Sequence, residues 1–149
     1  MTADEVTAGR ERGDVVPRPV PMTAADARDE VQRLLGDWFR RVRQGVADEV
    51  VLADALLVTT ELVTNAIRHG DGLSAFQADL TERGLRVTVS DHSEVPPTVI
   101  TPTNAEGTVR VGGYGWPLIR RLARDIAVIP RSGGKTISVL VPLPQAPGV

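Results

Sequence analysis

The longest mainly apolar stretch of the chain runs from about Asp48 to Gly70, and its spacing predicts one long helix. At about 100° per residue, most of its apolar side chains fall on one broad side, which is typical of a helix that covers a core. This side comprises Leu52, Ala55, Leu56, Thr59, Leu62, Val63, Ala66 and Ile67. The rest of the chain must therefore supply the surfaces that bury this helix.

A polar line on the same helix carries Glu61 and Asn65, one turn apart, with Asp54 and Arg68 close to it. Asparagine is a poor residue for a helix interior, because its side chain competes for backbone hydrogen bonds. A carboxamide oxygen suits Mg²⁺, and a carboxylate can accept a proton from a hydroxyl. The alternative is a solvated Glu61, an Asn65 near the helix end and Gly70 as a C-terminal cap, and these residues alone favour it.

The totals of the chain exclude several classes of function. Its 149 residues are enough for one domain with a sizeable core. A net charge of −2 predicts no direct binding to nucleic acid or to an anionic membrane. The absence of cysteine excludes thiolate catalysis and cysteine zinc sites. Because we find no signal segment or membrane span in the sequence, we expect a cytoplasmic protein.

The pattern predicts one domain between two short tails. Residues 1–21 are polar and rich in Gly and Pro, which predicts a disordered tail or an edge strand. Residues 22–143 form the predicted domain, and residues 144–149 a frayed end. Thr23 is the expected N-cap of a first helix that runs to about Gln44.

Two pairs of short strands follow the long helix. Alternating residues predict strands over 75–80 and 85–90, with a hairpin loop between them, and a second pair over 125–129 and 135–141. Between the pairs lie an irregular stretch from about Ser93 to Gly112, expected to be a mobile lid, and a short helix from Trp116 to Ala123. The predicted fold is α+β: a two-layer sandwich with a mixed or antiparallel sheet, covered on one face by helices.

Three further positions have residue types that suit a nucleotide. Asp91 ends a predicted strand, where its carboxylate could accept from an exocyclic amine such as that of adenine. Gly113 and Gly115 precede a helix, so their backbone could approach phosphate oxygens. Thr136 follows two glycines and a lysine, and its hydroxyl could reach the same phosphates. Each has a simpler alternative: a turn aspartate, ordinary loop glycines and a β-favouring threonine.

The order of these pieces resembles the ATP-binding domain shared by DNA gyrase, the large heat-shock chaperone, histidine kinases and the mismatch-repair ATPase. Within that superfamily the chain looks most like the short, stand-alone anti-sigma-factor serine/threonine kinases of bacteria. The resemblance spans roughly residues 23–142. It is carried by the segments 61–70 (ELVTNAIRHG), 89–91 (VSD), 113–118 (GYGWPL) and 134–136 (GKT).

The resemblance implies a Bergerat-type fold and a role for each matching residue. Asn65 would hold Mg²⁺ between the phosphates, Glu61 would orient or deprotonate the attacking group, and Asp91 would read the adenine amine. One phrase departs from the family pattern, because His92–Pro97 replaces the usual glycine-rich segment after the aspartate.

The remaining implied roles fall later in the chain. Gly113 and Gly115 would hinge the lid and approach the phosphates, and Thr136 would contact the nucleotide from the last strand. Arg110 would meet the γ-phosphate or the protein substrate, although it lies one position out of register with the family pattern.

The resemblance therefore implies ATP and Mg²⁺ as cofactors and phosphorylation of a small anti-sigma-factor antagonist, with a sigma factor as an alternative partner and a possible homodimer. A second hypothesis is a non-catalytic module that senses ATP or ADP and sequesters a protein. A third is a scaffold without a nucleotide site.

Overall fold

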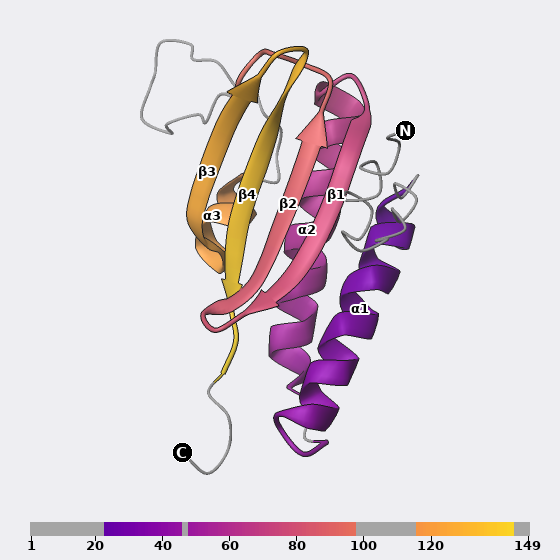
Figure 1. Ribbon diagram of the computed structural model, residues 1–149, viewed down its shortest axis with the longest axis vertical. Coiled ribbons are helices and arrows are strands. Elements are labelled where there is room, and N and C mark those ends of the chain that lie inside the picture. The colour runs from indigo at the N-terminus through magenta and orange to yellow at the C-terminus, as the bar shows by residue number, and fades with distance from the viewer. Residues whose placement is uncertain (1–22, 46–47, 98–115, 145–149) are drawn as a thin grey trace, which may run out of the picture.

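The computed structural model describes residues 23–45, 48–97 and 116–144 (Figure 1). In chain order the elements are α1 (Ala24–Arg41), α2 (Glu49–His69), β1 (Leu73–Thr81), β2 (Gly84–Asp91), α3 (Trp116–Leu122), β3 (Arg124–Arg131) and β4 (Gly134–Pro142). The predicted tails, residues 1–21 and 144–149, lie outside the described residues except for Pro144.

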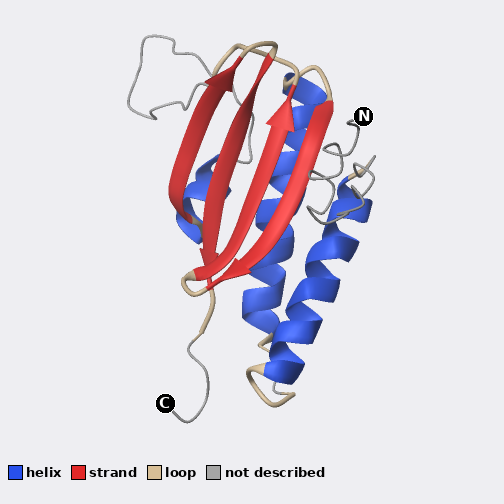
Figure 2. Cartoon of the chain, in the orientation of Figure 1, coloured by secondary structure: helices blue, strands red, loops and turns tan. Residues whose placement is uncertain are grey.

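The described strands form one four-stranded sheet in the order β1-β2-β4-β3, with every neighbouring pair antiparallel. The described helices lie on one face of this sheet, as Figure 2 shows. The α+β two-layer sandwich predicted from the sequence is therefore confirmed. The two hairpins, β1-β2 and β3-β4, meet through the β2-β4 pairing at the centre of the sheet.

Both long helices begin at a side-chain cap. The Thr23 hydroxyl accepts the backbone N–H of Asp26 at the start of α1, as predicted. One carboxylate oxygen of Asp48 accepts the N–H groups of Val50 and Val51 at the start of α2. The first helix ends at Arg41, three residues before the predicted Gln44, whose φ of 54° is incompatible with a right-handed helix.

Helix α2 lies between the sheet, α1 and α3, and it supplies much of the core. Its buried residues are Ala55, Val58, Thr59, Leu62, Val63 and Ala66. The predicted core side is right except at Ile67, which is 43% exposed, and Val58 is fully buried beside the predicted stripe. Among the described residues, α2 is long and apolar enough to span a bilayer by length and composition. Six of its residues are buried in the described fold, and the core helix of a folded domain passes the same test.

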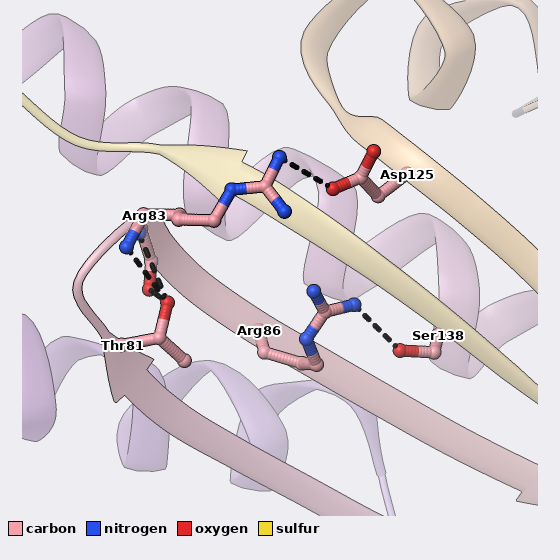
Figure 3. A network of polar contacts seen from close by, with 6 residues as sticks. Thr81, Arg83, Arg86, Asp125 and Ser138 are labelled. Atoms are coloured by element: carbon pink, nitrogen blue, oxygen red, sulfur yellow. Dashed lines mark hydrogen bonds and ion pairs between the residues drawn. The ribbon is translucent and has the colours of Figure 1, made fainter.

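The sheet has one apolar and one polar face, because successive strand residues point in opposite directions. The apolar face of the central strands carries Leu85, Val87 and Val89 on β2, and Ile137, Val139 and Val141 on β4. Figure 3 shows polar contacts at one end of the sheet: Arg86 donates to the Ser138 hydroxyl at 3.0 Å, and Arg83 pairs with Asp125 at 2.9 Å.

The second hairpin is longer than its predicted strands. Pro130 and Arg131 were expected in the connecting loop, but they belong to β3 and pair with Lys135 and Gly134. Proline is tolerated here because β3 is an edge strand, which can lack an N–H donor on its free side.

Candidate functional site

A pocket is lined by residues from the end of α2, the end of β2 and the start of β4. Figure 1 shows that these three ends lie at the same end of the molecule. The pocket encloses about 470 Å³ of space, part of which is open to solvent. The lining is mostly apolar, with a few polar groups, which is the usual character of a small-molecule site. The lining residues are Leu62, Asn65, Ala66, His69, Gly70, Val89, Asp91, Val95, Pro96, Pro97, Trp116, Lys135 and Ile137.

Asp91, the last residue of β2, places a buried carboxylate in this pocket. The residue is 4% exposed, and each carboxylate oxygen has a partner. Oδ1 accepts the backbone N–H of Ser93 at 3.0 Å, and Oδ2 lies 2.9 Å from Nζ of Lys135. The predicted acceptor at Asp91 therefore lines the pocket and is held in place from two sides.

Gly70 lets Asp91 approach the end of α2. Its N–H donates to Ala66, as in the predicted cap, and its carbonyl accepts the N–H of His92 at 2.9 Å. A Cβ added at Gly70 would lie 2.6 Å from Cγ of Asp91, closer than real side chains come. The glycine is therefore required by the carboxylate beside it, as well as by the helix end.

Asn65 lines the pocket from α2, and its side-chain Nδ2 is buried without a hydrogen-bond partner among the described residues. An unpaired buried amide costs free energy, so this group is available to a ligand. Because the amide oxygen and nitrogen exchange places by a half-turn of the side chain, either atom can be presented there.

Glu61 lies one helical turn before Asn65 and is half-buried, but it is outside the set of residues that line the pocket. A ligand long enough to extend along α2 from Asn65 would come near its carboxylate. The described residues contain no group of three or more His, Asp or Glu side chains placed to hold a metal ion. A cation at Asn65 would therefore take most of its ligands from water and from a bound anion.

A family model described as the histidine kinase-like ATPase domain matches residues 20–140 of the sequence. The chain belongs to the histidine kinase-like ATPase family. A search among curated proteins found no match.

Solved structures similar to this histidine kinase-like ATPase domain include a blue-light activated histidine kinase from Erythrobacter litoralis EL346. It is 18% identical, with a TM-score of 0.45, and the match covers 80% of this chain and 46% of that protein. The histidine kinase domain of the same enzyme matches at 17% identity and a TM-score of 0.46, covering 85% of this chain and 66% of that one. The chain thus spans about half of the longer protein and about two thirds of its domain.

Histidine kinase-like ATPase domains bind ATP, typically with Mg²⁺. The apolar walls of the pocket suit a flat base, Asp91 supplies an acceptor for an amine, and Asn65 supplies an unpaired amide. The predicted ligand pair, ATP and Mg²⁺, therefore agrees with the chemistry of the residues present.

The structure corrects the prediction for Thr136, which does not line the pocket. Thr136 pairs with Ser90 across the strands, and the two hydroxyls lie 2.8 Å apart on the polar face of the sheet. Since strand residues alternate, the neighbouring Lys135 points to the helical face and into the pocket. The sequence prediction chose the wrong residue of an adjacent pair.

The structure also corrects the predicted beginning of the lid. Ser93 was expected to be mobile, but it is 7% exposed and is held through both its N–H and its carbonyl. The three other predicted site residues, Arg110, Gly113 and Gly115, lie outside the described residues.

Several pocket residues were not predicted from the sequence as part of a site. They are His69, Val95, Pro96, Pro97, Trp116 and Lys135. The two prolines after Asp91 were a usable signal, because they keep the chain extended beside the strand end. For Lys135, the usable signal was that it is the only lysine of the chain.

Proposed function

We propose that this histidine kinase-like ATPase domain acts as an anti-sigma-factor-type serine/threonine kinase. Its substrate would be a small anti-sigma-factor antagonist, with a sigma factor as a second partner, so that transcription is controlled by partner switching. The observation that carries the proposal is the convergence of Asn65 from α2 and Asp91 from β2 on one pocket. The proposal implies a cytoplasmic location, and a homodimer is compatible with it.

Each side chain has a separate role in the proposed reaction. The Asp91 carboxylate would accept a hydrogen bond from the adenine amine, and the Asn65 amide oxygen would be a ligand of Mg²⁺. Bound Mg²⁺ supplies positive charge that offsets the negative charge of the phosphoryl group during transfer.

Glu61 acts on the partner protein's hydroxyl. Its carboxylate orients that hydroxyl and takes its proton as the oxygen bonds to the γ-phosphorus. The bond between the γ-phosphorus and the β,γ-bridging oxygen breaks, and ADP leaves with the electron pair. The products are a phosphorylated serine or threonine and ADP. Most of the rate gain comes from positioning, since the protein forms no covalent bond to the phosphoryl group.

A thermal unfolding scan tests nucleotide binding. Mg·ATP at 100 times its Kd should stabilise the folded chain by about 2.7 kcal/mol and raise the Tm. No rise in Tm at millimolar Mg·ATP would support the scaffold hypothesis and remove ATP from the proposal.

A transfer assay with γ-labelled ATP and candidate antagonist proteins tests catalysis. Glu61→Gln should lower the transfer rate by about 10²- to 10⁴-fold, while the affinity for ATP stays close to that of the parent. Glu49→Gln, at the exposed start of the same helix, is the matched control and should transfer normally. Undiminished transfer in Glu61→Gln would show that this carboxylate is not the base.

One observation favours the alternative of a non-catalytic ATP- or ADP-sensing module: Glu61 does not line the pocket. Such a module would bind nucleotide and sequester a protein partner without phosphorylating it. Calorimetry followed by the transfer assay separates the two functions, because tight binding of ATP with no transfer to any partner supports the sensor.

A further inference from the structure

The only lysine of the chain is buried in the pocket, paired with the carboxylate that is proposed to read the base. Lys135 is 5% exposed and Asp91 is 4% exposed, and the two residues face each other in register on β4 and β2. Burying two charges carries a desolvation penalty, so a buried ion pair is weak evidence of a purely stabilising role. Its place in the lining of a pocket points instead to a ligand.

The hydrogen-bonding capacity of the pair is only partly used. The ammonium group has three donors. One is directed at Oδ2 of Asp91 at 2.9 Å and one at the carbonyl of Ser93 at 3.3 Å, which leaves a third without an acceptor among the described residues. The carboxylate has about four lone-pair positions, and its partners among those residues, Ser93 and Lys135, occupy two. The pocket therefore presents a free donor next to a free acceptor.

A donor next to an acceptor is complementary to the Watson–Crick edge of adenine, which belongs to its six-membered ring. That edge carries the 6-amino group, a donor, beside the ring nitrogen N1, an acceptor. We propose that Lys135 is a second base-reading residue, whose ammonium donates to N1 while Asp91 accepts from the 6-amino group. This inference rests on the proposed binding of ATP and adds the residue that selects the ring nitrogen.

Calorimetry on the full chain compares Mg·ATP with Mg·1-deaza-ATP, in which N1 is replaced by C–H. Loss of a hydrogen bond to a charged donor should weaken binding about 10- to 100-fold. If the chain binds ATP and 1-deaza-ATP with equal affinity, the role of Lys135 is overturned and the proposed function still stands. Absence of ATP binding would overturn both.

A variant completes the comparison. Lys135→Met should weaken the binding of ATP to about the affinity that the parent chain has for 1-deaza-ATP. It should change the affinity for 1-deaza-ATP by no more than about twofold, because the substitution and the modified ligand remove the same contact. Thr136→Val is the matched control, because the adjacent side chain lies on the opposite face of the sheet. It should bind both ligands like the parent chain. Additive losses in Lys135→Met and 1-deaza-ATP would contradict the proposal.

A second measurement covers the case in which Lys135→Met fails to fold because Asp91 is left unpaired. Labelling the parent chain with ¹⁵N-lysine gives a single side-chain amine signal in NMR spectra, since the chain has one lysine. ATP should shift this signal clearly more than 1-deaza-ATP does. Equal shifts with the two ligands would overturn the inference without any substitution.

Discussion

Asp91 illustrates how single residues make the site. Its carboxylate is surrounded by Gly70, Ser93 and Lys135, which lie 21 residues before it, 2 after and 44 after in the sequence. The three neighbours act differently, because the glycine leaves space, the serine N–H donates, and the lysine balances the charge. The position of this one side chain therefore depends on α2, on the segment after β2 and on β4 together.

Gly70→Ala tests the close approach of α2 to Asp91. The added methyl group would overlap the carboxylate, so either the helix end or Asp91 must move. We expect a loss of about 1–3 kcal/mol in the free energy of unfolding and weaker binding of ATP. Denaturant unfolding and calorimetry measure the two effects. An alanine variant with unchanged stability and affinity would show that the pocket yields easily at this point.

Asn65→Leu should change stability and binding in opposite directions. The free chain should gain up to about 1 kcal/mol, because a buried amide without a partner is replaced by an apolar group. Mg·ATP should no longer raise the Tm, because the ligand for the cation is gone. Thermal scans with and without Mg·ATP measure both. A loss of stability in the free variant would mean that the amide is satisfied in solution.

At the scale of elements, α2 unites the core with the site. Its apolar side is covered by the sheet and α1, while its last turns supply Leu62, Asn65, Ala66 and His69 to the pocket. The helix begins at the Asp48 cap and ends at His69, and Asp71 beyond the Gly70 cap has a φ of 58°, which a right-handed helix does not allow. Because one helix carries both the core residues and the pocket residues, Asn65 is positioned by core packing and not by a loop.

Asp48→Ala tests the cap at the start of this helix. Two backbone N–H groups lose their acceptor, so the free energy of unfolding should fall by about 1 kcal/mol. Asp54→Ala, within the same helix and with no capping bond, is the control and should change it by less than about 0.5 kcal/mol. Urea denaturation compares the two. Equal losses in the two variants would mean that removal of a negative charge, and not loss of the cap, lowers the free energy of unfolding.

At the scale of the whole molecule, two antiparallel hairpins are joined into one sheet and covered by helices on one face (Figure 1). The joint between them is the β2-β4 pairing, which places Asp91 opposite Lys135. The pocket lies at one end of this joint, so its walls come from both hairpins and from α2. The site exists only when both halves of the chain are assembled.

Leu35→Ala separates stability of the whole fold from the chemistry of the site. Leu35 is fully buried on α1 and lies outside the pocket lining. The cavity should lower the free energy of unfolding by about 2–5 kcal/mol. The Kd for ATP, measured by calorimetry at a temperature where the variant is folded, should stay within about twofold. A large change in Kd would indicate that core packing and the pocket are coupled.

Most of the elements could be predicted from local patterns. The long helix, both hairpins and the Thr23 cap follow from residue spacing, which is set by neighbours within a few positions. The predictions were wrong at residues whose surroundings are set by segments distant in the sequence. Ile67 continues the apolar stripe of α2 but is largely exposed. Pro130 belongs to a strand, where proline is tolerated because that strand is at the edge of the sheet.

The sequence by itself determined the order of helices and strands, the place of Asn65 in the last turns of its helix and that of Asp91 at the end of its strand. Only the tertiary structure showed that Lys135, and not Thr136, lines a pocket beside Asp91. Period-two alternation with Ile137 and Val139 places Lys135 on the apolar face, but its partner on that face depends on the register with β2. Register is a property of the assembled sheet, because hydrogen bonds between strands and packing under the helices set it together.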